Sequence, residues 1–220
     1  MKPLKWLLKE VWRLKIFLRN KKSMTTKIVC ALLHIQSTSL RSIVKVFSIV
    51  ENFSHESVRK WALKIAPLLP KPTKKHRQIV AIDETEIKIA GKWAYLWTAV
   101  DFATKEVLAT MISWTRNILL ARAFAFQMLK ACKNKPFVAV DGGVWFPSAL
   151  TRLGFKWKRV EGGVRNCVEQ WYAIFKRRTK VFNNHFPVWK VGIEFHVVGR
   201  FVDAFVGLYN LQLRKEVRSA

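Results

Sequence analysis

Acidic residues are scarce in this chain, which has 14 Asp and Glu against 40 Lys and Arg among its 220 residues. The resulting formal charge of +26 predicts a polyanionic partner, because Lys and Arg that neutralise phosphates release condensed counterions. Nucleic acid is the first candidate and an anionic membrane surface is the second. The same scarcity means that any acid at the end of an apolar run needs a specific explanation.

Long uncharged hydrophobic runs are also missing, and their absence weakens the membrane interpretation. Charges interrupt the amphipathic stretch 5–14 every few residues and no small-residue cleavage site follows it, so it is neither a signal peptide nor a span. The most apolar long stretch, 195–213, carries Arg200 and Asp203 in its middle, which favours a packed helix. We therefore expect a cytoplasmic protein without a membrane partner.

Cysteine is limited to Cys30, Cys132 and Cys167, and none of them belongs to a C-x-x-C pair. Neither a disulfide framework nor a zinc ribbon is indicated. Cys30 and His34 share a helix face, but no second pair stands nearby, and a buried thiol beside a surface histidine explains them without a metal. No histidine is assigned a catalytic role.

Composition divides the chain near residue 78. Residues 1–78 hold 18 of the basic residues and 3 of the acidic ones. Prolines and a basic cluster in 67–77 forbid a continuing helix and predict an exposed linker on the DNA side. We predict a helical DNA-binding domain over 1–70, a basic Pro-rich linker over 71–78 and a second domain over 79–220.

Two helical patterns in the first domain, 39–48 and 54–69, have the proportions of a helix-turn-helix, and Ser54 can cap the second helix. In a helix-turn-helix the second helix enters the major groove of DNA. A simple two-helix packing element would carry the same charges on a solvated face, and the pattern alone leaves both interpretations open. The candidates for DNA contact are His55, Glu56, Arg59, Lys60 and Lys64.

After residue 78 the hydrophobic period becomes that of a sheet. The order of three strands, a helix, a strand, a helix, a strand and a helix predicts an α/β domain of the ribonuclease-H-like class, with a mixed five-stranded sheet flanked by helices. The predicted strands cover 78–89, 92–101, 106–114, 137–140 and 156–160, and the predicted helices cover 117–132, 147–153 and a long segment from 164.

Three acids acquire a shared geometry in such a domain. Asp83 and Asp141 each follow an apolar run, and Glu169 lies in a basic helix. A crossover helix returns the chain so that the fourth strand runs parallel to the first, which brings Asp83 and Asp141 together. Oxygen-only ligands suit Mg²⁺ or Mn²⁺, so the three acids predict a site for two divalent ions. Each acid alone is weaker evidence, because Asp101 also ends a strand and a strand-terminal Asp is usually a turn former.

The chain resembles the DDE transposases of prokaryotic insertion sequences, in particular the compact group typified by insertion sequence six. The resemblance rests on the segments DET at 83–85, GKWAYL at 91–96, DGGVWFP at 141–147, VEQ at 168–170 with FKRR at 175–178, and SHESVRKW at 54–61.

This resemblance implies an activity and its partners. Asp83, Asp141 and Glu169 would be the metal-binding catalytic triad, and Lys176 would contact the end of the element. The implied reaction is cleavage at transposon ends with Mg²⁺ or Mn²⁺, followed by transfer of the 3′-hydroxyl into target DNA. The implied partners are the terminal inverted repeats, the target DNA and further copies of the chain in a homodimer or larger assembly at the prokaryotic nucleoid.

Helical geometry supports the role of Lys176. It follows Glu169 by about two helical turns, roughly 10 Å, and therefore projects from nearly the same helix face. Arg165, Arg177 and Arg178 are further candidates for DNA contact, although a solvated cluster explains Arg177 and Arg178 equally well.

The interval from Asp141 to Glu169 is shorter than is typical for the family, and Glu161 is the alternative third acid. Two other functions stay open. A ribonuclease-H-like nuclease would use the same fold and metals, and an inactive remnant of a transposase would bind DNA without cutting it.

Overall fold

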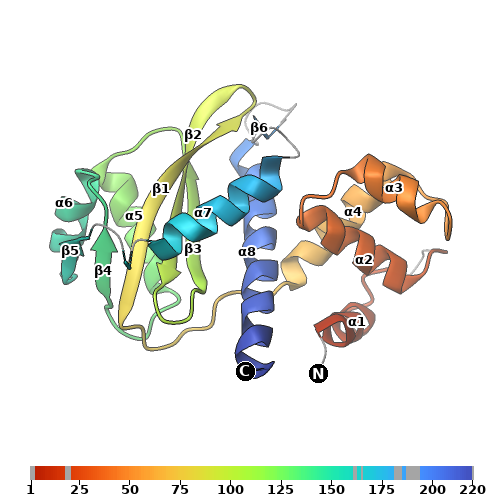
Figure 1. The fold of residues 1–220 in the computed structure, drawn as a ribbon, viewed down its shortest axis with the longest axis horizontal. Helices are drawn as coiled ribbons and strands as arrows, with labels where there is room; N and C mark the ends of the chain where they lie inside the picture. The colour runs from red at the N-terminus through yellow and green to blue at the C-terminus, as the bar shows by residue number, and fades with distance from the viewer. Residues whose placement is uncertain are drawn as a thin grey trace.

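The computed structural model describes residues 3–17, 21–160, 163–164, 166–180, 185–186 and 194–219. A helical head stands beside an α/β unit, and the long C-terminal helix runs between them (Figure 1). The head contains α1 (Pro3–Arg13), α2 (Met24–Ile35), α3 (Leu40–Phe47), α4 (His55–Ile65) and the short 3₁₀ helix η1 (Ala66–Leu68). The α/β unit contains β1 (Ile79–Ile89), β2 (Lys92–Asp101), β3 (Val107–Ser113), α5 (Ile118–Leu129), β4 (Phe137–Val140), α6 (Trp145–Arg152), β5 (Trp157–Arg159), α7 (Asn166–Thr179), β6 (His185–Phe186) and α8 (Glu194–Ser219).

Five strands form a mixed sheet in the order β3-β2-β1-β4-β5, and the two-residue strand β6 pairs with the far end of β1. Strands β1, β2 and β3 pair with one another in antiparallel fashion. Strand β4 runs parallel to β1, and β5 runs parallel to β4. This topology confirms the ribonuclease-H-like class. It also confirms that the fourth strand lies beside the first, which the crossover rule predicts.

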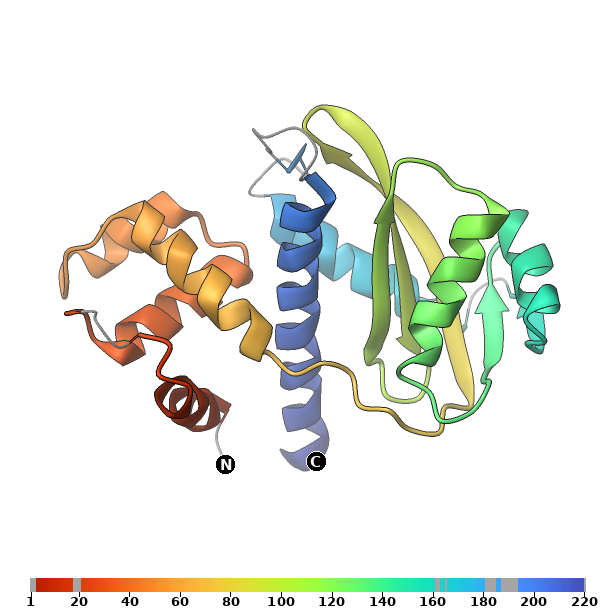
Figure 2. The same cartoon turned by 180° about the vertical axis from the view of Figure 1, so that it is seen from behind.

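Helices cover both faces of the sheet. Because side chains alternate along a strand, Val80 and Ile82 of β1 point into one core with α5 and α6, whereas Ala81 and Ile87 point into the other with α7 and α8. Figures 1 and 2 show α7 crossing one face and α5 lying against the opposite one. Both faces of the short strand β4 are therefore buried, which explains why its sequence is wholly apolar.

The core of the head is centred on α4. Two serines cap helices of the head. Ser54 Oγ accepts from the Ser57 amide at 3.2 Å, which is the cap that the sequence predicts, and Ser39 Oγ accepts from the Ser42 amide at 3.1 Å. The buried face of α4 carries apolar residues at helical spacing, namely Val58, Trp61, Ala62 and Ile65.

Helix α8 belongs to two cores at once. Ala204 and Leu208 pack with the buried residues of the head, whereas Val202 and Phe205 pack with those of the α/β unit. The two parts approach closely at Gly207, where an added Cβ would lie 2.8 Å from the Cβ of Leu69. The two parts of the chain therefore pack against opposite sides of the same helix.

The linker ends in a buried ion cluster. Arg77 donates to Asp101 at 3.2 Å and to Glu106 at 2.8 Å, and Arg214 of α8 donates to the other oxygen of Glu106 at 2.7 Å. The prediction of an exposed linker is therefore wrong for Arg77, whose side chain is only 1% exposed. The strand-end Asp101 also accepts from the Thr104 amide at 3.1 Å, so it is the turn former that the sequence allows.

Replacing Arg77 by Met should lower the free energy of unfolding at neutral pH by about 3 kcal/mol, because it leaves acids buried without their counter-charge. Burial by itself would raise the pKa of Glu106, but Arg214 and Arg77 outweigh burial and lower it. The stability that Glu106 contributes is thus present above its ordinary pKa of 4.5 and is lost as the pH falls through the lower folded value. Urea unfolding across acid pH should show a smaller acid-side loss in Arg77→Met than in wild type.

The exposed ion pair of Arg13 with Glu10 provides the control. Arg13→Met should change stability little, because exposed pairs are screened by solvent. Equal effects of the two substitutions would contradict a structural role for the buried cluster.

Two glycines of α8 should respond oppositely to alanine. An added Cβ at Gly199 meets nothing within 4 Å, so Gly199→Ala should gain about 0.5–1 kcal/mol of helix propensity. Gly207→Ala should be destabilising overall, because overpacking against Leu69 costs about 1–3 kcal/mol. Thermal unfolding followed by circular dichroism measures both. A rise in Tm for Gly207→Ala would show that the head can move away from α8 without cost.

Candidate metal centre

Strand pairing places the first two acids side by side. The parallel ladder between β1 and β4 pairs Ile82 with Val140, and Asp83 and Asp141 are the next residue on each strand. The fourth strand stops at Val140, so Asp141 stands at its carboxyl end, whereas β1 continues beyond Asp83 into the hairpin with β2. The sequence prediction for this pair of acids is therefore matched by the register of the sheet.

A third carboxylate joins them, and it is Glu84. One carboxylate oxygen from each of Asp83, Glu84 and Asp141 lies within 4.8 Å of the others. We call these residues the three-acid cluster. In the sequence Glu84 reads only as a neighbour of Asp83 whose side chain should point to the opposite face of the sheet. Nothing in the spacing of the acids signals that its longer side chain reaches the same point.

Backbone amides hold the two aspartates in place. Asp83 Oδ1 accepts from the Glu84 amide at 2.8 Å, and Asp141 Oδ1 accepts from the Gly143 amide at 2.9 Å. The guanidinium of Arg159 lies against Gly142, where a Cβ would come within 2.3 Å of its Nη2 atom. Glycine at 142 therefore allows a basic side chain of β5 to lie against the loop that carries Asp141.

Glu84 is held by a cation enclosed between aromatic rings. Arg116 Nη1 donates to Glu84 Oε1 at 3.3 Å, and the Arg116 guanidinium lies 4.3 Å from the ring centre of Tyr95 and 4.7 Å from that of Trp145. Burial and then the charge of Asp141 raise the pKa of Glu84, whereas Arg116 and the indole of Trp145 oppose that rise. No hydrogen bond within normal limits joins Trp145 to Glu84, and both Glu84 Oε2 and Trp145 Nε1 are buried without one.

Glu169 lies in the first turn of α7 and is exposed. It does not belong to the three-acid cluster, which is the one group of three or more potential metal ligands among the described residues. Its role as third acid stays a prediction. The alternative acid Glu161 and the basic candidate Arg165 lie outside the described residues.

Tyr172 fixes α7 against the strand that carries the acids. Its hydroxyl donates to the Asp83 carbonyl oxygen at 2.7 Å and lies 3.1 Å from that of Leu96. Burial, followed by the negative charge of Asp83, raises the pKa of Tyr172 well above its ordinary value. The side chain therefore stays a neutral hydrogen-bond donor one helical turn after Glu169.

Tyr172→Phe should lower the free energy of unfolding by about 1–2 kcal/mol, because it leaves a buried carbonyl without its donor. Urea unfolding gives the value. Tyr95→Phe is the matched control, since the ring of Tyr95 contacts Arg116 and no hydrogen bond from its hydroxyl is seen among the described residues. If both variants lose the same stability, the hydroxyl of Tyr172 does not fix α7.

Three of the predicted basic residues lie together at the end of α7. Lys176, Arg177 and Arg178 are exposed in its last turn, where positive charge also stabilises the helix dipole. Arg177 and Arg178 line an open groove of about 620 Å³ between α7 and the head, which is completed by Gln36, Ser37, Thr38, Ser39 and Ser42.

The candidates of the head lie on the outer face of α4. His55, Arg59, Lys60 and Lys64 are all exposed. Arg59 donates two hydrogen bonds to Glu56, at 2.7 and 2.6 Å, which satisfies both side chains locally. Lys64 lies 5.6 Å from the ring centre of Phe17 and donates to the Ile16 carbonyl at 3.4 Å, so it also contacts the segment after α1. The choice between helix-turn-helix and simple packing element stays open.

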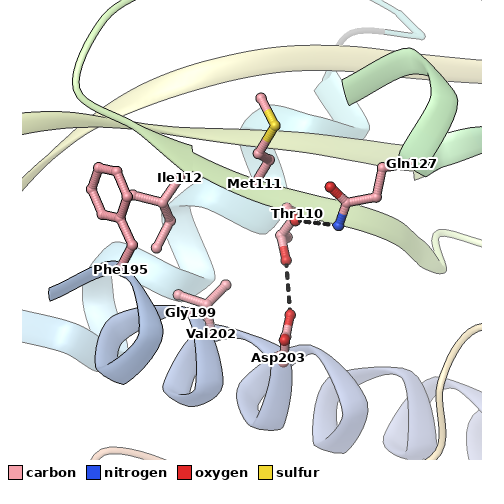
Figure 3. Close-up of a pocket in the computed structure, with 8 residues that line it drawn as sticks. All are labelled: Thr110, Met111, Ile112, Gln127, Phe195, Gly199, Val202 and Asp203. Atoms are coloured by element: carbon pink, nitrogen blue, oxygen red, sulfur yellow. Dashed lines mark hydrogen bonds between the residues drawn. The ribbon is translucent and has the colours of Figure 1, made fainter. Parts of the chain in front are cut away.

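A small cavity of about 130 Å³ lies between β3, α5 and α8, away from the acids (Figure 3). Gln127 donates to the Thr110 carbonyl at 2.8 Å, and Thr110 Oγ1 lies 3.4 Å from Asp203. Burial raises the pKa of Asp203, with Thr110 and Lys71 opposing it. No member of the three-acid cluster lines this cavity. Its walls are formed by Thr110, Met111, Ile112, Gln127, Phe195, Gly199, Val202 and Asp203.

The helices of the described residues include none that is long and apolar enough to cross a membrane. The packed-helix interpretation of 195–213 is confirmed, because α8 buries Val198, Val202 and Phe205 against the sheet.

A ribonuclease-H-like sheet with acids on two adjacent parallel strands is the arrangement of metal-dependent nucleases and polynucleotidyl transferases. A family model described as a DDE domain matches residues 77–190, and the chain belongs to this family of insertion-sequence DDE transposases.

Two relatives and one solved structure illustrate the likeness. An uncharacterized protein of Methanocaldococcus jannaschii is 43% identical over 89% of this chain and 90% of its own length. The transposase for insertion sequence-like element IS431mec of Staphylococcus aureus is 37% identical over 94 residues. The matched segment covers 41% of this chain and 42% of that protein. The magnesium complex of the HTLV-2 integrase catalytic core domain, in its trimeric form, is 14% identical, with a TM-score of 0.43 over 60% of this chain and 85% of that one.

Proposed function

We propose that this chain is the DNA transposase of an insertion sequence, which cuts at the ends of its element and joins the free 3′-hydroxyl to target DNA. The observation that carries the proposal is that Asp83 and Asp141 lie side by side, each directly after the paired segments of the parallel strands β1 and β4. Family membership supports transposase activity. The metal-dependent steps are our inference from the acids.

The donor set of the site fits Mg²⁺ or Mn²⁺. Every ligand atom offered by Asp83, Glu84 and Asp141 is a carboxylate oxygen, and divalent ions of this kind prefer oxygen ligands. Two such ions, when bound, would polarise the scissile phosphate and lower the pKa of the attacking water or 3′-hydroxyl. No covalent intermediate with the protein is needed.

In this proposal Asp83 and Asp141 position the ions, and Glu169 completes the triad from the first turn of α7. Tyr172 fixes the position of α7 on β1 through its hydrogen bond to the Asp83 carbonyl oxygen. Lys176 projects from nearly the same helix face as Glu169 and would hold a phosphate of the element end beside the metals.

DNA would be held by both parts of the chain. The formal charge of +26 supplies the general attraction to phosphate, and α4 of the head would read the terminal inverted repeat. The groove between α7 and the head carries Arg177, Arg178 and several hydroxyl groups, which suit a phosphodiester backbone passing between the two parts. Such proteins join two ends, so we propose action as a dimer or larger assembly.

The test is strand transfer by the purified protein on a labelled duplex that carries the DNA flanking its gene, with Mg²⁺ or Mn²⁺. We expect metal-dependent joining by wild type and a loss of at least roughly a hundredfold in Glu169→Gln, the size typical for removal of one charge-stabilising group. Glu86→Gln, which removes an exposed acid of β1, is the matched control and should join normally.

Two results would replace the proposal. Specific binding of the element end without joining by wild type would identify an inactive DNA-binding remnant. Cleavage without preference for the element end would identify a nuclease of the same fold. Full activity of Glu169→Gln would remove Glu169 from the triad.

A further inference from the structure

We propose that Glu84 is itself a ligand of the divalent ion held by Asp83 and Asp141, and that these three acids bind an ion in the DNA-free protein without Glu169. This inference rests on the proposed function of the site. Glu84, which follows the first acid of the triad in sequence, would be an additional metal ligand. The ion would bind before Glu169 takes part in the site.

Proximity is the first argument. Oxygens of Asp83, Glu84 and Asp141 lie within 4.8 Å of one another, a separation that a single ion with ligand distances near 2.0–2.6 Å can bridge. Glu169 is not part of this cluster. The acids that are close enough to share an ion in the described structure are therefore the two strand aspartates and Glu84.

Glu84 also carries a buried oxygen that lacks a hydrogen-bond partner. The side chain of Glu84 is only 5% exposed, and its Oε2 atom makes no hydrogen bond. Leaving a carboxylate oxygen buried and unpaired costs more than a typical hydrogen bond gains. A cation shared with Asp83 and Asp141 would satisfy this oxygen and also offset the repulsion among the three carboxylates.

Arg116 explains how Glu84 is kept in position. It contacts Oε1, the other oxygen of the same carboxylate, and its guanidinium is enclosed by the rings of Tyr95 and Trp145. Arg116 thus orients the carboxylate and leaves Oε2 available to a metal. The arrangement is that of a ligand with a supporting partner, which is common around bound metal ions.

The experiment is calorimetric titration of the DNA-free protein with Mn²⁺, repeated as the Mn²⁺-dependent rise in Tm. We expect Glu84→Gln to raise the Kd for Mn²⁺ at least about tenfold, because loss of even a supporting group typically costs that much. Glu86→Gln, on the same strand, and Glu169→Gln should both bind Mn²⁺ like wild type. If Glu84→Gln unfolds without metal, Glu84→Asp is used, and it should bind more weakly than wild type.

Asp83→Asn distinguishes failure of this inference from failure of the proposed function. If Asp83→Asn loses Mn²⁺ binding but Glu84→Gln retains it, the metal site stands and Glu84 is not a ligand. If Asp83→Asn also binds like wild type, the metal site fails and this inference fails with it. Equal weakening in Glu84→Gln and Glu86→Gln would reveal only a general charge effect, and loss of binding in Glu169→Gln would overturn assembly without Glu169.

Discussion

The parallel pairing of β1 with β4 is the constraint on which the rest of this structure depends. Hydrogen bonds along four residue pairs, from Ile79 with Phe137 to Ile82 with Val140, set the register that places two carboxylates side by side. A parallel pair requires a crossover, which α5 supplies, and burial on both faces, which α6 and α7 complete. The helices around the sheet therefore help to set the positions of the two aspartates, together with the backbone amides that bind their carboxylates.

The distribution of charge turns this geometry into a site. A chain of +26 would attract nucleic acid over most of its surface, yet the three-acid cluster gathers negative charge. The two tendencies are compatible because the acids are recessed in the sheet, with Asp83 only 6% exposed, whereas the arginines of α7 and α4 are at the surface. A nucleic acid that approaches through its phosphates would therefore meet the basic side chains before the recessed acids.

Sequence reasoning predicts those features that repeat along the chain or follow from chain order. The strands, the major helices, the cap at Ser54 and the pairing of Asp83 with Asp141 all belong to this kind. It misses what depends on side chains reaching across elements. Glu84 alternates away from Asp83 on a strand, but its length and the hold of Arg116 bring its carboxylate back to the cluster. Arg77 reads as one more charge in a basic linker, and only the fold shows that Asp101 and Glu106 surround it.

The shared helix α8 bears on how such a protein can change. Its residues pack into the core of the head on one side and into a core of the α/β unit on the other. At Gly207 the helix lies too close to Leu69 for even an added Cβ. The core of the head is completed by Ala204 and Leu208, which lie at the opposite end of the sequence. Exchanging the head for another DNA-binding segment would therefore leave the head-facing side of α8 without its packing partner, and we expect the head and α8 to change together.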